Sequence, residues 1–329
     1  MNLDSLFTLI VPVRDRHYNL PSIIHYYKNT SYRKIIYDAS EKPFDGPVGN
    51  FEYHHAGPEF QHQSYLNAYK MSDTPFLINC PDDDIMTHDS IRRCIGFLKD
   101  NSDYSACDGE VVEWVPGDDF VSPAPKPDVF RARTLHDWDA DDIFQRIRFG
   151  VVDCSRSCMH SFIKTDDAIH IMQNFMNNPE ITPLSFLDRV YTFASLCRGK
   201  IKTLPVVQHV RTSNHRPNAD RNMFNPEIAN EEIDGFGLKL DVAMRDLIDV
   251  KHCSKFSHYL EENSDLNDQE ALQWTINLYN EHFLQRDKNG GGGYFGRSHD
   301  TTKVILPCKT KESGVIISEA IDSMSKAEP

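Results

Sequence analysis

The stretch Phe76-Leu-Ile-Asn-Cys-Pro-Asp-Asp-Asp-Ile85 joins an apolar run to three consecutive carboxylates. The apolar part predicts a buried strand whose carboxyl end delivers Asp82, Asp83 and Asp84 to the edge of a sheet, where open α/β sheets place their ligands. Adjacent carboxylates repel one another unless a cation lies among them, and oxygen ligands at a strand end suit Mg²⁺ or Mn²⁺. We therefore predict a divalent-cation site here. The alternative is a solvated acidic loop in which Asp89 caps the following helix.

Two further strand signals precede this stretch. Phe7–Val13 is a nearly continuous apolar run, typical of a strand buried on both faces, and Lys34–Tyr37 is a shorter one. The segment between them has a helical pattern with a proline in its first turn, so the three elements predict a right-handed βαβ unit. Both strands end in polar residues. Arg14, Asp15 and Asp38 should therefore line the same edge of the sheet.

Helical and strand-like patterns alternate along the rest of the first two thirds of the chain. Helices are predicted over residues 60–71, 89–99, 165–177 and 182–197, and strands over 51–54, within 104–115, and over 201–204 and 206–210. Phe60, Leu66 and Tyr69 are expected to form the buried face of the first of these helices. Residues 116–142 are rich in Pro, Asp and aromatic residues without periodicity. Such a segment predicts a functional loop, with disorder as the alternative.

The composition changes after residue 217. Long helical patterns occupy residues 231–250 and 268–284, followed by a glycine-rich stretch over 290–296 and a polar tail. The sequence thus predicts an α/β fold with a mostly parallel sheet over residues 1–217 and a mainly helical extension over 218–329. We expect the extension to pack as helices on the α/β domain. It contains no acidic cluster at a strand end, so we do not expect it to carry a second site of this kind.

Composition excludes several classes of protein. The 329 residues are 40% hydrophobic, enough for a substantial core, and the net charge of -14 disfavours binding to nucleic acids or acidic membranes. No clear basic patch and no transmembrane segment is visible, and the first residues do not resemble a signal peptide. Eight cysteines are too sparse for a disulfide framework. These features predict a cytoplasmic protein.

Taken together, the motifs resemble those of GT-A glycosyltransferases, especially the inverting, family-2-like enzymes. The segment 8–16 is similar to their first strand and turn, Asp38 to the acid that ends their second strand, and residues 81–85 to their metal signature. Leu187-Asp188, Gly199, Pro205 and Gln208-His209 then follow in the family's order. The family usually has Glu where this chain has Leu187, and a carboxylate pair where it has Asp38 alone.

The resemblance implies a role for each matching residue. It implies contacts with a nucleotide-sugar donor, a UDP-sugar in the first instance, from Pro12, Asp38, Asp82 and Asp83, with Arg14, Asp15 and Arg16 as weaker candidates. It implies metal ligands for Mn²⁺ or Mg²⁺ in Asp82, Asp83, Asp84 and His209, and a general base in Asp188. A packed histidine at a strand edge and an aspartate that favours the helix dipole are the structural alternatives for His209 and Asp188.

The expected reaction is transfer of the sugar to a hydroxyl of a glycan or another acceptor, with inversion. The irregular segment 116–142 and the C-terminal extension are expected to shape the acceptor side or to contribute contacts of a homo-oligomer. A nucleotidyltransferase acting on sugar phosphates is one alternative, although it would require a glycine-rich phosphate loop that Pro12–Arg16 does not provide. A carbohydrate-binding protein with a degenerate site is the other.

Overall fold

A computed structural model provides the structure of the chain. It describes residues 2–115, 129–133, 137–153, 158–176, 184–212, 250–288 and 319. Most of the predicted loop over 116–142, the predicted boundary at 217, the helical pattern before residue 250 and the glycine-rich stretch lie outside the described residues.

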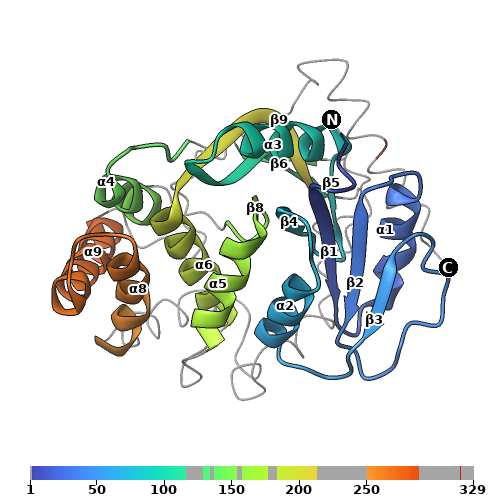
Figure 1. Cartoon of the computed structure of the whole chain (residues 1–329), viewed down its shortest axis with the longest axis horizontal. Helices are drawn as coiled ribbons and strands as arrows, with labels where there is room; N and C mark the ends of the chain where they lie inside the picture. The colour runs from blue at the N-terminus through green and yellow to red at the C-terminus, as the bar shows by residue number, and fades with distance from the viewer. Residues whose placement is uncertain are drawn as a thin grey trace, which may run out of the picture.

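The centre of the protein is a mixed β-sheet (Figure 1). Its order is β3 (Glu52–His55), β2 (Arg33–Asp38), β1 (Phe7–Val13), β4 (Phe76–Asn79), β8 (Phe162–Lys164), β6 (Tyr104–Val115), β9 (Lys200–Thr212) and β5 (Asp84–Met86), while β7 (Val129–Arg133) pairs with β6. Strands β3, β2, β1 and β4 are mutually parallel, and so are β6 and β9. Strand β8 is antiparallel to both β4 and β6, and β5 is antiparallel to β9. The predicted α/β class is confirmed, with the parallel pairing concentrated in the first half of the sheet.

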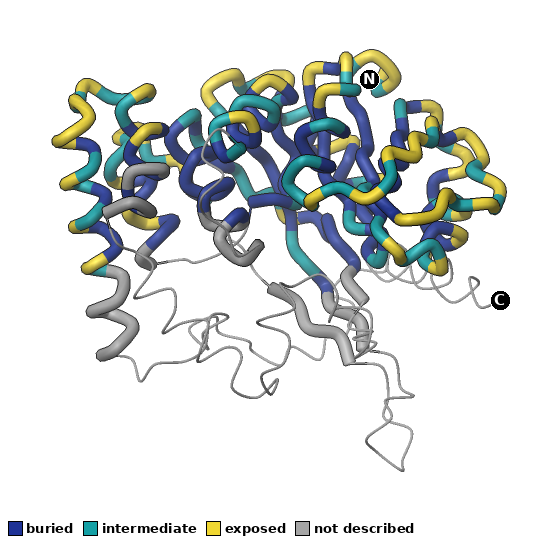
Figure 2. The backbone as a smooth tube through the Cα atoms, turned by 90° about the horizontal axis from the view of Figure 1, so that it is seen from below, coloured by how far each residue is buried: buried dark blue, intermediate teal, exposed yellow. Residues whose placement is uncertain are grey.

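The first βαβ unit forms where the sequence predicts it. β1 and β2 pair in parallel, with Ile10 opposite Ile35, and α1 (Leu20–Tyr27) between them begins with its proline in the first turn. Every residue of β1 except Pro12 is buried, because helices cover both faces of this part of the sheet. Figure 2 shows buried residues gathered in the interior of the described backbone and exposed residues along its outer turns and loops.

Two hydrophobic cores lie on opposite faces of the sheet. On one face, Leu9 and Val11 pack with residues of α1 and α3 (His88–Asp100). On the other face, Ile10 and Leu77 pack with the remaining helices. These helices are α2 (Gln61–Lys70), α4 (Ile143–Arg148), the short η2 (Phe149–Asp153), α5 (Thr165–Met176), α6 (Leu184–Arg198), α8 (Val250–Glu262) and α9 (Asp268–Lys288). The alternation of neighbouring strand residues between faces thus assigns each core to one helical layer.

The described C-terminal helices belong to the second of these cores. Phe256 of α8 lies 5.1 Å, between ring centroids, from Phe193 of α6 and 4.9 Å from Tyr279 of α9. Tyr259 Oη donates a hydrogen bond of 2.8 Å to the carbonyl oxygen of Ile171 in α5. The helix predicted over 268–284 is confirmed by α9. Residues 250–288 therefore pack directly on α5 and α6.

Two long strands replace the shorter pieces expected from the sequence. Residues 104–115 form β6, and the pieces on either side of Pro205 form β9. The register between β6 and β9 shifts between Asp108 and Glu110, so the extra residues of β9 around Pro205 are accommodated as a bulge. Gly109 permits this crossing, because a Cβ there would lie 2.4 Å from the carbonyl oxygen of Val206.

The predicted burial of Phe60 is wrong, and so is the Asp89 cap of the solvated-loop alternative. Phe60 is 77% exposed, whereas Leu66 and Tyr69 are buried as expected. Phe60 precedes the first turn of α2 in an extended conformation, so its side chain is directed away from the helix's packed face. The cap of α3 is Thr87 and not Asp89: the Thr87 hydroxyl oxygen accepts a hydrogen bond from the backbone N–H of Ser90.

Candidate active site

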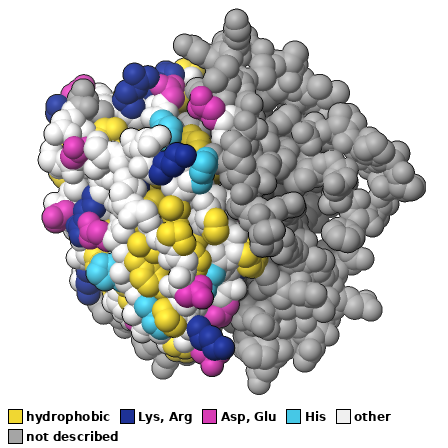
Figure 3. Space-filling model, turned by 90° about the vertical axis from the view of Figure 1, so that its right-hand side faces the viewer, with side chains coloured by type: hydrophobic (Ala, Val, Ile, Leu, Met, Phe, Trp, Pro, Cys, Tyr) yellow, Lys and Arg dark blue, Asp and Glu magenta, His cyan; other side chains and the backbone are white. Residues whose placement is uncertain are grey.

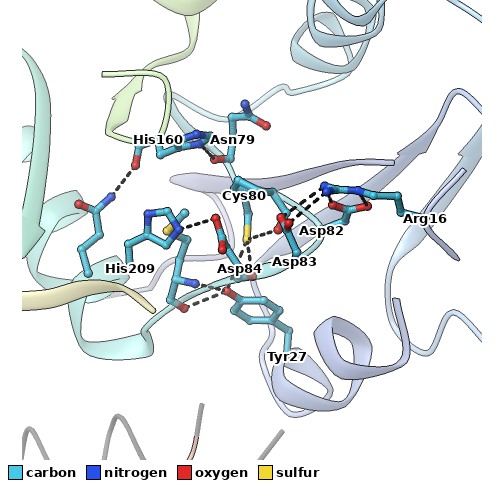
Figure 4. Close-up of polar contacts among 12 residues, drawn as sticks. Arg16, Tyr27, Asn79, Cys80, Asp82, Asp83, Asp84, His160 and His209 are labelled. Carbon is cyan, nitrogen blue, oxygen red and sulfur yellow. Dashed lines mark hydrogen bonds and ion pairs between the residues drawn. The ribbon is translucent and has the colours of Figure 1, made fainter. Parts of the chain in front are cut away.

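The three consecutive carboxylates do not share one strand end. β4 ends at Asn79, the chain turns so that the backbone N–H of Asp84 donates to the carbonyl of Pro81 at 3.2 Å, and Asp84 begins β5. Asp82 and Asp83 lie in the turn. The expectation of one strand delivering all three is therefore corrected. The turn divides the carboxylates between two groups of partners (Figure 4).

The first group is centred on Arg16. Its Nε donates to Asp82 Oδ2 at 3.0 Å and its Nη1 donates to Asp83 Oδ2 at 3.0 Å, while Nη2 also contacts both carboxylates. The Asp82 side chain is 1% exposed and that of Asp83 is 34% exposed. The pKa of Asp82 is raised to about 7, because burial outweighs the opposing charge of Arg16 and the Asp83 carboxylate adds to the upward shift. Asp82 therefore depends on a neighbouring positive charge to remain ionised at neutral pH.

The second group pairs Asp84 with His209. Strand β9 runs antiparallel to β5 with His209 opposite Met86, and this register places His209 Nε2 2.7 Å from Asp84 Oδ2. Both side chains are buried. The contact is not aligned as a hydrogen bond, so the buried Nε2 has no hydrogen-bond partner among the described residues. A carboxylate oxygen beside an imidazole nitrogen without a hydrogen bond is a donor set that fits a divalent cation.

The four predicted metal ligands do not converge. Within the described part of the chain, no group of three or more His, Cys, Asp or Glu side chains is arranged to hold a metal ion. Asp82 and Asp83 contact Arg16, and Asp84 contacts His209. Mg²⁺ is usually bound by one or two carboxylates, with water and substrate phosphates completing its shell, so the pair of Asp84 and His209 remains a fitting partial site. The metal roles of Asp82 and Asp83 stay predictions.

Asp38 lies at the end of β2 and is fully buried. Its Oδ2 accepts a hydrogen bond from Tyr53 Oη at 2.6 Å and lies 2.8 Å from His17 Nε2, while Oδ1 accepts from the backbone N–H of Ser40 at 2.9 Å. Burial acts to raise the pKa of Asp38, but hydrogen bonds from Ser40 and Tyr53 outweigh it, and the net shift is downward. With its oxygens occupied in this way, Asp38 positions His17 and Tyr53. These two residues are then better placed than Asp38 to contact a ligand.

The remaining residues expected on the nucleotide side follow β1. Pro12 is half-buried in the strand, opposite Tyr37 of β2. Arg14 Nη1 donates to the carbonyl of Glu59 at 3.0 Å. Asp15 adopts a left-handed conformation, with a φ of 55°, and its backbone N–H donates to Ser40 Oγ at 2.7 Å. The structure thus brings these residues to the carboxyl ends of β1 and β2, as predicted.

Asp188 lies in the second turn of α6. The residue before it in the helix, Leu187, is buried in the core. The side chain of Asp188 falls outside the described residues, so its role as a general base stays a prediction. Helix α6 ends at Arg198, as expected from Gly199. A Cβ at Gly199 would lie 2.8 Å from the backbone nitrogen of Ser105, so glycine permits the close approach of the helix end to β6.

Sequence reasoning missed a supporting layer around His209. Gln208 accepts a hydrogen bond of 2.7 Å from the backbone N–H of Gly109 and donates to the carbonyl of His160. His160 Nδ1 lies 3.2 Å from the carbonyl oxygen of Asn79, and its ring centroid is 5.7 Å from that of His209. His160 carried no local signal, because only the pairing of β8 with β4 brings it there. Gln208 was part of the recognised motif but had no assigned role.

On the face shown in Figure 3, Lys and Arg side chains are dispersed among Asp and Glu around a group of hydrophobic side chains. None of the helices in the described ranges has the length and apolar character needed to cross a bilayer.

The comparisons with known proteins yield only a distant likeness in structure. Neither a protein-family model nor a curated protein sequence matches the chain. Among solved structures, residues 1–349 of S. aureus TarS in complex with UDP-GlcNAc align over 98% of this chain and 82% of that chain, with 11% identity and a TM-score of 0.46. The same TarS fragment in complex with UDP aligns over 86% and 92% of the two chains, with 12% identity and a TM-score of 0.40. Similarity at this level does not assign a function.

Proposed function

We propose that the protein is a metal-dependent glycosyltransferase of the GT-A type, which moves a sugar from a nucleotide-sugar donor to an acceptor hydroxyl with inversion. The observation that carries this proposal is the buried pair of Asp84 and His209, beside Asp82, Asp83 and Arg16. These groups lie next to the carboxyl ends of β1 and β4. Strand β2 lies on one side of β1 in the sheet and β4 lies on the other, so the strand order reverses at β1. Ligands of open α/β sheets bind at such a reversal.

Asp84 and His209 are the residues proposed to hold the cation, together with the donor diphosphate and water. A bound Mn²⁺ or Mg²⁺ supplies Lewis-acid stabilisation of the charge that develops on the leaving diphosphate. The protein's own contribution is to fix both ligands in a buried setting. Strand β5 supplies Asp84, and the Gln208 hydrogen bonds anchor the neighbouring residue of β9, so neither ligand has to be ordered when the donor binds.

Asp188 is proposed as the general base. In an inverting displacement, a carboxylate on the side of the acceptor takes the proton from the attacking hydroxyl, and such assistance contributes roughly a hundred- to ten-thousandfold in rate. Helix α6 covers the opposite face of the sheet from α1 and α3, so Asp188 and the carboxylates of residues 82–84 belong to different elements. The described residues give only its backbone position.

The nucleotide is proposed to lie over the ends of β1 and β2, with a UDP-sugar as the preferred donor. Asp38 holds His17 and Tyr53 there, and the His17 ring lies 5.6 Å from that of Phe44. Aromatic rings held by hydrogen bonds offer a flat face for a nucleobase and polar edges for a ribose. Arg14 and Asp15 flank this region. The six described cysteines are all free, which supports a cytoplasmic location.

Two other functions remain as alternatives for the experiment to separate. A nucleotidyltransferase acting on sugar phosphates would also use carboxylates and a metal ion, but would release pyrophosphate. A non-catalytic carbohydrate-binding protein would bind sugars without turnover. The resemblance of the ordered motifs from residue 7 to 211 favours the glycosyltransferase.

The decisive experiment is a screen of nucleotide sugars with purified protein, with release of nucleoside diphosphate as the readout. We expect release from a UDP-sugar in Mn²⁺ or Mg²⁺ and none in excess EDTA. Release of pyrophosphate from a nucleoside triphosphate and a sugar phosphate would instead support the nucleotidyltransferase. For an active donor, NMR coupling constants of the product give its anomeric configuration, and retention would contradict direct displacement assisted by Asp188.

A further inference from the structure

Arg16 bridges two loops that meet at the reversal point of the sheet. It lies in the loop that follows β1, and its partners Asp82 and Asp83 lie in the turn that follows β4. β1 and β4 are neighbouring parallel strands, with Ile10 opposite Asn79. The ion pair therefore crosses the position where the diphosphate of the proposed donor would lie.

The contacts of Arg16 are those of a cation held among carboxylates. One planar guanidinium reaches both Asp82 and Asp83, and Arg16 itself is only 19% exposed. The same fork geometry matches phosphate oxygens as well as carboxylate oxygens. Asp82 is buried and stays ionised only with a positive charge beside it, so the removal of Arg16 without a substitute would favour the protonated carboxyl group.

We propose that Arg16 exchanges partners during donor binding: it moves from Asp82 and Asp83 to the donor diphosphate while a divalent cation takes its place beside these carboxylates. The inference rests on the proposed function and deepens it, because it assigns Arg16 the role of a positioning residue for the diphosphate. No covalent bond changes in the exchange. The pairs of the guanidinium with Asp82 and Asp83 are replaced by contacts of the cation with these carboxylates and of the guanidinium with phosphate.

The exposures of the two carboxylates set the order of the exchange. Asp83 is 34% exposed and Asp82 only 1%, so an incoming cation meets Asp83 first and competes there with Arg16. Arg16 therefore lowers the affinity for a cation that arrives alone and raises the affinity for a diphosphate that arrives alone.

The test is isothermal titration of the full chain with Mn²⁺ alone and, separately, with inorganic pyrophosphate alone. Compared with the wild type, Arg16→Gln should bind Mn²⁺ at least about fivefold more tightly and pyrophosphate at least about tenfold more weakly. The matched control is Arg33→Gln. Arg33 also forks over two carboxylates, Glu52 and Asp73, but at the opposite end of β2. It should change neither affinity.

Unchanged or weaker Mn²⁺ binding by Arg16→Gln, or unchanged pyrophosphate binding, would overturn the exchange. It would show that Arg16 keeps Asp82 and Asp83 as its partners and has only a structural role. If Arg16→Gln does not fold, as judged by thermal unfolding, Arg16→Lys carries the test. Lysine keeps one charge but cannot fork over two carboxylates, so Mn²⁺ should again bind more tightly than in the wild type, and equal or weaker binding overturns the proposal. Both titrations are independent of turnover. The exchange can therefore stand even if no nucleotide sugar proves to be a substrate, and it can fail in an active glycosyltransferase.

Discussion

Two arginines fork over two carboxylates each, at opposite edges of the same sheet. At the carboxyl edge Arg16 contacts Asp82 and Asp83, and at the amino edge Arg33 contacts Glu52 and Asp73. The partners differ in exposure. Asp82 is 1% exposed, whereas Glu52 and Asp73 are 46% and 81% exposed. Solvent therefore screens the ion pairs of Arg33 more strongly than the ion pair of Arg16 with Asp82.

The two edges also differ in how their buried charged groups are hydrogen-bonded or paired. At the amino edge the buried cation Lys34 is surrounded by the backbone carbonyl oxygens of Thr30 and Tyr32, at 2.7 and 3.0 Å, and needs no ligand. At the carboxyl edge three carboxylates share Arg16 and His209. Two of these carboxylates, Asp82 and Asp84, are buried, and a buried carboxylate favours a neighbouring cation, whereas the ammonium group of Lys34 is hydrogen-bonded within the protein.

The largest effect is expected from loss of the metal site at the carboxyl edge. Excess EDTA should abolish release of nucleoside diphosphate, and Asp84→Asn should lower turnover at least about a hundredfold, because it removes a charged ligand from a buried position. Steady-state kinetics with Mn²⁺ restored measure the effect, with a thermal unfolding curve as the control for folding. Full activity in EDTA would show that turnover needs no metal ion, and the carboxyl edge would then not differ from the amino edge as a cation site.

The next effect concerns the base on α6. Asp188→Asn should lower kcat by roughly a hundred- to ten-thousandfold. The KM for the donor should change little, because the donor is bound by the groups at the ends of β1, β2 and β4. A variant with normal kcat and a raised donor KM would place Asp188 among the binding residues and leave the base unassigned.

A smaller effect, on stability, is expected from Lys34 at the amino edge. Burial lowers the pKa of Lys34 from its ordinary value of 10.5 to about 8, and Asp4 only partly offsets this. Between these two values the unfolded chain binds more protons than the folded protein, so the free energy of unfolding should increase as the pH rises above about 8. The increase should be less than about 1 kcal/mol per pH unit, since each unit of pKa shift corresponds to about 1.4 kcal/mol.

Urea unfolding between about pH 7.5 and pH 9.5 measures this dependence. Lys34→Met should remove it while filling a similar volume, and Lys28→Met provides a control at a lysine outside the core. A wild-type stability that falls over this range would mean that Lys34 keeps its charge in the folded state.

The smallest effect is expected from Arg33→Gln. Exposed ion pairs contribute about 0–1 kcal/mol, so the free energy of unfolding should fall by less than about 1 kcal/mol and turnover should not change. Urea unfolding and steady-state kinetics check both values. A loss of activity in this variant would show that the exposed ion pairs of Arg33 at the amino edge affect turnover at the carboxyl edge, contrary to our expectation.

The first half of the sheet could be predicted from sequence because its signals are local. The continuous apolar runs of β1 and β2 and the proline at the start of α1 each specify an element within a few residues. The second half was harder to predict. The bulge opposite Gly109 depends on how β6 and β9 pair, so the local pattern suggested separate short strands. Phe60 was misplaced for a related reason, since a helical pattern does not fix the residue at which the helix begins.

The sequence by itself determined that a run of three carboxylates follows a buried strand, and that an aspartate, a glycine, a proline and a histidine follow in a recognisable order. Only the tertiary structure decided which carboxylate meets which basic side chain. Arg16 and Asp82 are 66 positions apart in the chain, and His209 reaches Asp84 through the antiparallel register of β5 and β9. Such pairs depend on strand order and register, which are set by the packing of the whole sheet between its two helical layers. Residue types can therefore indicate that a charged site exists, whereas the division of Asp82, Asp83 and Asp84 between Arg16 and His209 follows from the fold.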